Sequence, residues 1–242
     1  MTDLFDTEKQ AYNAQNQSAL PVFLQIAEHI ARQISAGHLL PDAKLPGERE
    51  MAHEYKVAVG TLRKSLAHLT QLGLLRRKQG SGNYIARNEN AASLYSFFRL
   101  ELHHGGGLPS ARLLDVTKLQ KPDDLPEFGT SSFGHRFRRI RYLDDWPVAL
   151  EEIWLDGACA DHIEAANVSD ALYHYYKTEL GQWVVKAEDS IGLAPPPSWY
   201  KGALNNPMGF IERFGWSQDA IAIEYSRTWY AADRARYVSR LK

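Results

Sequence analysis

Two arginines separated by a single residue are the clearest candidates for binding chemistry in this chain. Arg139 and Arg141 lie in a run that reads as extended, and residues two apart on a strand point to the same face. Two guanidinium groups on one face favour an anionic partner such as a phosphate or a carboxylate. The same spacing also fits a solvated outer face with cross-strand pairing to Glu151, and spacing alone favours that simpler interpretation.

A second group of basic residues lies near the N-terminus. Between Leu20 and Asn88 there are ten basic residues and five acidic ones, although the whole 242-residue chain has a net charge of −1. This asymmetry places any contact with a polyanion at the N-terminal end. Alone it is weak support for nucleic-acid binding, because surface arginines and lysines are commonly just solvated.

Other reactive residue types do not form a recognisable site. His103 and His104 could bind a metal, but adjacent side chains point apart and no third ligand is spaced with them. Glu151 and Glu152 are neighbours on a predicted strand and face opposite sides, so they do not form an acid/base pair. The single cysteine, Cys159, has no partner histidine and is interpreted as a small buried hydrophobe. We therefore expect no catalytic residue, no metal and no cofactor.

Hydrophobic periodicity predicts the elements that would position the N-terminal basic residues. Pro21 opens a helical apolar stripe that ends before Gly37, and 48–55 forms a second, short helix. A third helix covers 60–72, and a Gly-rich turn within 74–85 predicts a β-hairpin. Three helices followed by a basic hairpin is the order of a winged helix-turn-helix.

Several motifs follow one another in this segment. They are PVFLQI at 21–26, LPGEREMA at 45–52, the stretch 57–63, GLL at 73–75 and GSGNYI at 80–85. In this order and spacing they resemble the GntR family of bacterial regulators over 20–87. The resemblance implies DNA contacts through the third helix and the wing. Together with the position of Lys64 at the start of that helix, it assigns the DNA-binding residues as Arg49, Thr61, Arg63, Lys64, Gln79 and Gly80.

The chain departs from the family pattern at three places. Gly47 stands where the family usually has Ser, and glycine is a somewhat weaker N-cap. Ala58 and Val59 replace the usual Ser-Arg or Thr-Arg pair, so a helix cap and a DNA-contacting arginine are both missing. Val59 offers an apolar contact with a thymine methyl instead. In the wing, Asn83 replaces a threonine.

The periodicity changes after a connector that contains a helical patch at 93–103 and three glycines at 105–107. The remaining predicted elements alternate between extended and helical: a hairpin at 137–153 around 144–147, a helix at 170–180, an extended run at 183–193, a helix at 197–204, and a strand pair at 210–216 and 220–230. Strands joined by hairpins, with single helices between them, predict an α+β domain built on an antiparallel sheet.

The residues RRIR at 138–141, DDWPVALEE at 144–152 and IEYSRTWY at 223–230 carry a second resemblance. Over about 93–241 the chain resembles the UTRA domain of the HutC subfamily, which is similar to the chorismate-lyase fold but binds effectors instead of catalysing a reaction. The resemblance implies that the ligand pocket is lined by Arg139, Arg141, Glu151, Glu224 and Tyr230. It also places Ser96 at the start of a loop that contacts phosphate.

The predicted organisation is a flexible tail (1–19), a winged helix-turn-helix (20–87), a linker with the start of the sensor domain (88–110) and a UTRA-like domain (111–242). This describes a ligand-responsive repressor that binds a double-stranded operator as a homodimer and responds to a small anionic effector, such as a phosphorylated sugar or a carboxylate. The alternative is a lyase- or isomerase-like enzyme domain joined to a DNA-binding module. An all-helical, metal-binding sensor is disfavoured by the extended pattern after Gly105, and an aminotransferase fusion is excluded by length.

Cellular location follows from two further observations. The first twenty residues contain charged side chains and no apolar run, which excludes a secretory signal, and no later stretch is long and apolar enough to span a membrane. A single cysteine forms no disulfide within the chain. We therefore expect a cytoplasmic protein.

Overall fold

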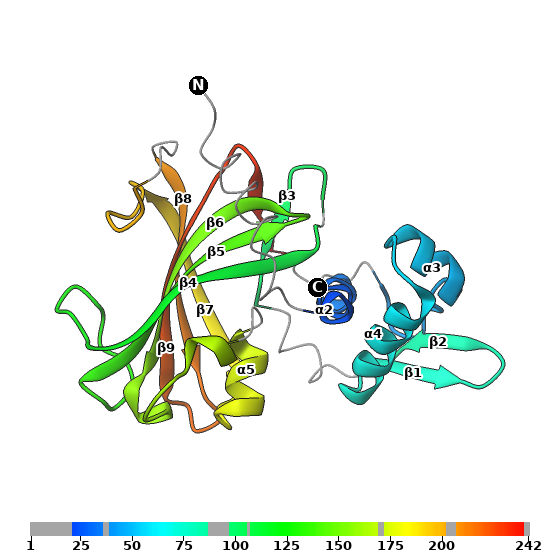
Figure 1. The fold of residues 1–242 in the computed structure, drawn as a ribbon, viewed down its shortest axis with the longest axis horizontal. Helices are drawn as coiled ribbons and strands as arrows, with labels where there is room; N and C mark the ends of the chain where they lie inside the picture. The colour runs from blue at the N-terminus through cyan, green and yellow to red at the C-terminus, as the bar shows by residue number, and fades with distance from the viewer. Residues whose placement is uncertain are drawn as a thin grey trace.

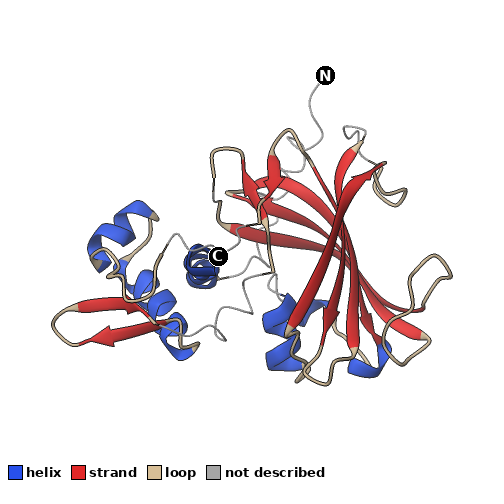
Figure 2. Cartoon of the chain, turned by 180° about the vertical axis from the view of Figure 1, so that it is seen from behind, coloured by secondary structure: helices blue, strands red, loops and turns tan. Residues whose placement is uncertain are grey.

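The computed structural model of this chain describes residues 21–35, 39–86, 97–105, 107–168, 172–201 and 207–239. The described elements form two units that lie side by side: a small helical unit with a two-stranded hairpin, and a larger unit built on a sheet (Figure 1). Most of the helical residues belong to the small unit and most of the strands to the large one (Figure 2). The molecule therefore has the α+β architecture that the sequence predicts.

The small unit has three helices, α2 (Val22–Ser35), α3 (Glu48–Glu54) and α4 (Val59–Gln71). An antiparallel hairpin of β1 (Leu75–Lys78) and β2 (Gly82–Ile85) follows them, as in a winged helix-turn-helix. All five elements are predicted by the sequence to within a few residues.

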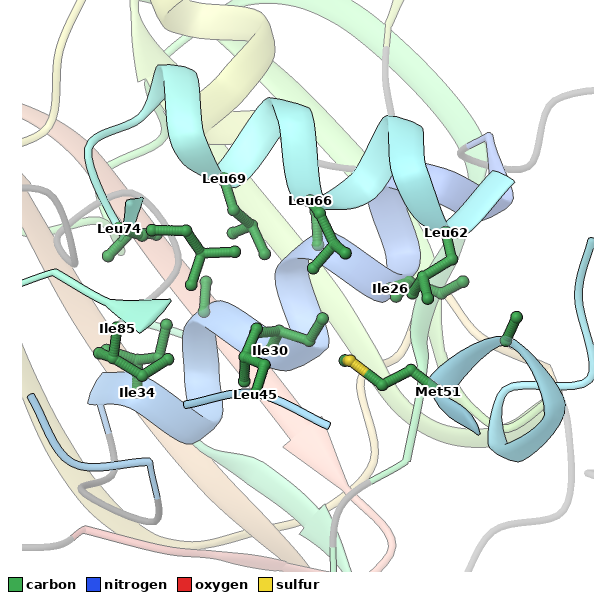
Figure 3. Close-up of a cluster of buried hydrophobic side chains, with 14 residues drawn as sticks. Ile26, Ile30, Ile34, Leu45, Met51, Leu62, Leu66, Leu69, Leu74 and Ile85 are labelled. Carbon is green, nitrogen blue, oxygen red and sulfur yellow. The ribbon is translucent and has the colours of Figure 1, made fainter. Parts of the chain in front are cut away.

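Apolar side chains at helical spacing hold this unit together. The stripe on α4 meets α2 and the hairpin in one buried cluster, whose largest members include Ile26, Ile30, Leu62, Leu66, Leu69, Leu74 and Ile85 (Figure 3). Each such side chain contributes about 1.5–3 kcal/mol when it leaves water. Gly73 ends the stripe with a φ of 71°, a left-handed conformation that glycine adopts without steric cost. The fold of this unit is thus encoded locally.

The large unit is a six-stranded antiparallel sheet with the strand order β4-β5-β6-β9-β8-β7. Its strands are β4 (Pro109–Gln120), β5 (Phe133–Leu143), β6 (Trp146–Asp156), β7 (Lys186–Ala194), β8 (Met208–Trp216) and β9 (Ala222–Tyr230). Two 3₁₀ turns, η2 (Gly157–Cys159) and η3 (Ala165–Asn167), lead from β6 towards helix α5 (Leu172–Glu179). Leu172, Tyr175 and Tyr176 of α5 pack on the sheet against Phe137, Ile153 and Leu155. This helix therefore covers part of one sheet face.

The turn between β5 and β6 fixes the register on which the site depends. Asp144 and Asp145 have φ values of 49° and 62°, and successive left-handed residues suit a two-residue hairpin whose twist matches the strands. The resulting register sets Arg139 opposite Glu151 and Arg141 opposite Ala149. The sequence predicts the hairpin, although it assigns Trp146 to the turn and the structure assigns it to β6.

Three sequence expectations outside the hairpins differ from the structure. Residues 97–103 contain no helix, because β3 (Leu100–Leu102) pairs with β10 (Ala235–Tyr237) and buries alternate leucines, and the start of the predicted helical patch, 93–96, lies outside the described residues. Residues 197–201 form a turn closed by the Tyr200 amide and the Pro197 carbonyl, where a helix was expected. Strand β4 was not foreseen at all. The described residues contain no helix long and apolar enough to cross a membrane.

Candidate DNA-binding face and effector pocket

The residues predicted to contact DNA lie on the exterior of the winged helix. Arg49 is exposed at the start of α3, and Arg63 and Lys64 are exposed on α4, while Thr61 is half-buried. Gln79 and Gly80 are exposed at the tip of the wing, where Gly80 has a φ of 74°. The structure therefore presents all six residues on three elements of the same unit, and their contacts with DNA stay a prediction.

Arg63 is held by a partner that the sequence did not suggest. Its Nε donates to Oε2 of Glu48 at 2.7 Å, and the arginine side chain is 65% exposed. An exposed pair of this kind contributes only about 0–1 kcal/mol, because water screens it and both side chains lose freedom. Arg63 can exchange Glu48 for a DNA phosphate or base edge at little cost.

The helix starts of this face lack side-chain caps, as the departures from the family pattern predicted. Gly47 precedes α3 and Ala58 precedes α4, and neither makes a side-chain capping hydrogen bond. In the wing, Tyr84 supports the basic strand: Lys78 Nζ lies 4.5 Å from its ring centroid, and the Ser81 and Tyr84 hydroxyls are 2.7 Å apart. The tip is therefore braced on a ring that the sequence interpretation did not single out.

A cavity of about 80 Å³, room for several water molecules, opens in the large unit between its sheet, helix α5 and helix α2. Its walls carry polar groups from elements far apart in the chain. They include Arg139, Arg141, Glu151, Arg213, Glu224, Tyr173 and Glu28, and the apolar ring of Phe98 lines the cavity beside them. A concave site with a few convergent polar groups is the expected form of a small-molecule pocket.

Three of these residues form a buried ionic cluster. Arg139 Nε donates to Glu151 Oε2, and Arg141 Nε lies 3.5 Å from Glu151 Oε1. Each of the three residues is at most 6% exposed. Burial would raise the pKa of Glu151, but the two guanidinium groups outweigh it and hold the pKa below its usual value. The cross-strand pairing to Glu151 is thus confirmed, whereas the solvated outer face is wrong.

The pKa of Glu224 is shifted in the opposite direction to that of Glu151. It is 2% exposed and accepts a hydrogen bond of 2.7 Å from the hydroxyl of Tyr173 on α5. Burial raises its pKa, against the opposing effects of the Tyr173 hydrogen bond and Arg213. Its Oε2 and the Tyr176 hydroxyl make no hydrogen bond of good geometry among the described residues, although the nearby hydroxyl also acts to lower the pKa of Glu224. A buried carboxyl oxygen in this state is suited to a hydroxyl or amine donor of a ligand.

Strand register explains where Tyr230 lies. Glu224, Ser226, Thr228 and Tyr230 alternate along one face of β9, and the first three line the cavity. Tyr230 is the next residue on that face and does not line it. Its ring lies over Gly209, where an added Cβ would be 2.1 Å from Tyr230 Cζ. Ser96 lies outside the described residues.

The sequence interpretation missed several pocket residues because they come from other elements. Arg213 of β8 donates to Asp189 through Nε (2.5 Å) and Nη2 (2.6 Å). Its position two residues after Ile211 on the same strand face is a signal that alternation alone could have supplied. Tyr173 and Glu28 carried no such signal, because helix packing decides where their side chains point.

The cavity is not lined by the other candidates, Cys159, Glu152, His103 and His104. Cys159 is half-buried, and burial raises its pKa to about 11, so the thiol is poorly reactive. Glu151 and Glu152 face opposite sides of the sheet, and Glu152 pairs with Arg138 at 2.8 Å. Among the described residues there is no group of three or more His, Cys, Asp or Glu side chains that could hold a metal.

A DNA-binding winged helix joined to a polar small-molecule pocket defines the class of one-component transcription regulators. Comparison with protein families gives the same result: residues 23–85 match the model of bacterial regulatory proteins of the gntR family, and residues 104–236 match the UTRA domain. The chain belongs to the GntR family and carries a UTRA domain.

Curated relatives extend the match over nearly the whole chain. The HTH-type transcriptional regulator SmoD of Agrobacterium fabrum is 50% identical, over 93% of this chain and 97% of its own length. The repressor NagR of Bacillus subtilis is 26% identical over the same shares of the two chains. MngR of Escherichia coli, named as the repressor of a mannosyl-D-glycerate transport and metabolism system, is 26% identical over 90% of this chain and 94% of its own.

Solved structures support the fold. The ligand-binding domain of a GntR-family regulator from Bordetella bronchiseptica matches with a TM-score of 0.52 at 18% identity, covering 60% of this chain and 98% of that one. The regulator YydK of Bacillus subtilis matches with a TM-score of 0.50 at 17% identity, covering 92% of this chain and all of that one. The protein is therefore a ligand-responsive, DNA-binding transcription regulator. The enzyme alternative receives no support from these relatives.

Proposed function

We propose that the protein is a repressor whose release from its operator is controlled by a small, anionic, hydroxyl-bearing metabolite bound in the sheet pocket. The observation that carries this proposal is the buried cluster in which two arginines share one glutamate. Arg139 and Arg141 both line the cavity, so two guanidinium groups face the bound molecule. Guanidinium groups bind phosphate and carboxylate groups through strong, charge-assisted hydrogen bonds, which favours an anionic ligand.

The rest of the pocket indicates what the ligand carries besides its charge. Glu151 and Glu224 lie beside the arginines, and their oxygens accept hydrogen bonds from hydroxyl or amine groups. Ser226 and Thr228 add two hydroxyls to the same wall. A phosphorylated sugar or a sugar carboxylate has both features. The relative MngR is named for a system that handles mannosyl-D-glycerate, a sugar derivative, which agrees with this class of effector.

Replacing Arg141 with alanine tests the proposal directly. A panel of sugar phosphates and sugar carboxylates is first screened by thermal shift, because a ligand that binds only the folded state raises its stability. For the compound with the largest shift, Arg141→Ala should lose about 2–5 kcal/mol of affinity by calorimetry. Operator affinity without the compound should stay close to wild type.

Arg138→Ala is the matched control. Arg138 lies on the same strand but on the other sheet face, where it pairs with Glu152, so this variant should keep the affinity for the compound. The proposal fails if Arg141→Ala still binds the compound as wild type does. It also fails if the wild-type protein converts the compound into a product, because the domain would then be an enzyme.

A homodimer on a two-fold operator completes the proposed function. β7 is an edge strand of the sheet, and Ile191 and Leu193 on it are 53% and 70% exposed. An exposed apolar edge is a surface that a second copy can cover. Sedimentation should show a dimer, and footprinting should show two half-sites about 10–10.5 bp apart or a multiple of that spacing. A protein that binds an operator in this way works in the bacterial cytoplasm.

A further inference from the structure

The cavity is lined by a third arginine, Arg213, which belongs to a separate ion pair. Its guanidinium group donates to both carboxylate oxygens of Asp189, from Nε at 2.5 Å and from Nη2 at 2.6 Å. The hydroxyl of Tyr237 donates to the same carboxylate at 2.7 Å. The side chains of Arg213 and Asp189 are only 15% and 11% exposed. A two-point pair of this kind fixes the orientation of the guanidinium group as well as its position.

The strand register separates this arginine from the other two. On the face that lines the cavity, Arg139 of β5 lies opposite Glu151 of β6, and Glu151 lies opposite Thr228 of β9. Arg213 is on the next strand, β8, and three strand spacings of about 4.7–4.9 Å put roughly 14 Å between β5 and β8. Asp189 lies opposite Arg213 on β7, the strand farther from β5, and therefore holds the guanidinium group on that side. A phosphate or carboxylate group bound beside Arg139 thus leaves Arg213 to another part of the ligand.

Glu224 and Tyr173 line the cavity together with Arg213. The Tyr173 hydroxyl donates to Glu224 Oε1 at 2.7 Å, and Arg213 acts electrostatically on the same glutamate. A guanidinium group only donates hydrogen bonds and an ionised carboxylate only accepts them, whereas a hydroxyl group does both. A ligand hydroxyl between Arg213 and Glu224 can accept from the first and donate to the second. A second anionic group would instead meet the carboxyl groups of Glu224 and Asp189, so this wall suits hydroxyl groups.

We propose that Arg213 determines the specificity of the effector pocket by binding hydroxyl groups at the end of the ligand remote from Arg139 and Arg141. This inference rests on the proposed function, since it divides the same pocket into an anion subsite and a hydroxyl subsite. The ligand class is a sugar phosphate or sugar acid that carries its hydroxyl groups away from its anionic group. A bare anion fills only the anion subsite and leaves the donors and acceptors of the other wall without ligand partners.

The test compares bare anions with sugar anions by calorimetry on the full-length protein at constant ionic strength. One series contains inorganic phosphate and the 6-phosphates of glucose, mannose and galactose, and the other contains acetate, glucuronate and galacturonate. Wild type should bind at least one sugar anion more tightly than the bare anion of its series. Arg213→Met removes the donors and keeps an unbranched side chain. It should weaken binding of that sugar anion about 10- to 100-fold, as expected for hydrogen bonds to a charged group, and leave the affinity for the bare anion unchanged.

Arg227→Met is the matched control. Arg227 lies on the neighbouring strand β9, pairs with Asp124 at 2.8 Å and does not line the cavity, so this variant should bind every anion as wild type does. Because Arg213→Met leaves the buried Asp189 carboxylate without its arginine, the variant can be unstable. If thermal melts show that it is unfolded, the double variant Arg213→Met with Asp189→Asn, which removes both charges, is measured in its place with the same expected result.

Three results overturn the inference. They are a wild type that binds no sugar anion more tightly than the bare anion, an Arg213→Met variant that keeps the full affinity for the sugar anion, and an equal loss for bare and sugar anions in that variant. The third result would place Arg213 in the anion subsite. In each case a weaker affinity of Arg141→Ala for the bare anion leaves the proposed function standing. If Arg141→Ala binds every anion as wild type does, the proposed function itself is wrong.

Discussion

Two Arg–Glu pairs in this molecule contain the same chemical groups in opposite surroundings. Arg63 and Glu48 meet on the outer face of the winged helix, where the arginine side chain is 65% exposed. Arg139 and Glu151 meet on the floor of the cavity, where their side chains are 6% and 7% exposed. In water a pair is weak and exchangeable, whereas in the interior each partner depends on the other. The DNA-binding face is therefore built to change partners, and the sensor floor is built to keep its geometry.

The largest effect is expected from breaking the buried pair. Glu151→Ala leaves two guanidinium groups without their shared carboxylate, and removing one partner of a buried pair costs about 3–5 kcal/mol. Urea unfolding at neutral pH measures the loss. Glu48→Ala, which breaks the exposed pair, is the control and should cost at most about 1 kcal/mol. Similar losses in the two variants would contradict the distinction between the two regions.

The junction of the two regions should add a pH dependence to stability. His29 of α2 is half-surrounded by protein, and burial and then Arg32 lower its pKa from 6.5 to about 4. Because the pKa of His29 is lower in the folded state, at a pH between about 4 and 6.5 the imidazole is protonated in the unfolded chain and neutral in the folded chain. The protonation of His29 should therefore lower the free energy of unfolding by on the order of 3 kcal/mol as the pH drops from 6.5 to 4. Below pH 4 this histidine should cause no further loss of stability.

Urea unfolding at several pH values tests this expectation, with His29→Gln as the comparison. The glutamine variant should lose much less stability than wild type between pH 6.5 and 5. Below about pH 4.5 both proteins should lose stability through carboxyl groups such as Glu151 and Asp189, whose pKa values are lowered in the folded state. Parallel curves for the two proteins above pH 5 would show that His29 does not titrate as stated.

Replacing Arg63 is expected to have the smallest effect on the stability of the protein and a clear effect on its affinity for DNA. Arg63→Ala breaks only an exposed pair, so the free energy of unfolding should change by at most about 1 kcal/mol. Operator binding should weaken by about 1–3 kcal/mol if Arg63 contacts a base, and the loss should then be specific to the operator. A phosphate contact would weaken binding to any sequence and reduce its salt dependence. Unchanged affinity for the operator would remove Arg63 from the interface.

The same contrast between local and non-local packing explains what the sequence could predict. The winged helix was predictable because its helices carry regular apolar stripes and its ends carry glycines such as Gly73. The β5–β6 hairpin was predictable from its Asp144-Asp145 turn. Strand β4 was not, because Leu113, Leu114 and Val116 do not alternate with polar residues.

The pocket was predictable only in part. Alternation along a strand correctly placed Arg139 and Arg141 on one face, but it could not tell that α5 and α2 cover this face. That information lies in tertiary packing, so the solvated interpretation was preferred and was wrong. For the same reason Glu28 was counted among the charges of the DNA-binding segment and was not recognised as a wall of the cavity.

The double role of α2 has a consequence for the construction of chimeric regulators. A chimera that joins this winged helix to the sensor domain of a relative would be cut after the hairpin that ends at Ile85. In this protein such a cut separates Arg32 from the carbonyls of Leu100 and Gly107 that it binds. In such a chimera, Arg32 and Glu28 of α2 would face a sensor domain that does not offer the groups they contact in this protein. Transplanting the outward-facing residues of α2 together with the sensor should restore a responsive hybrid.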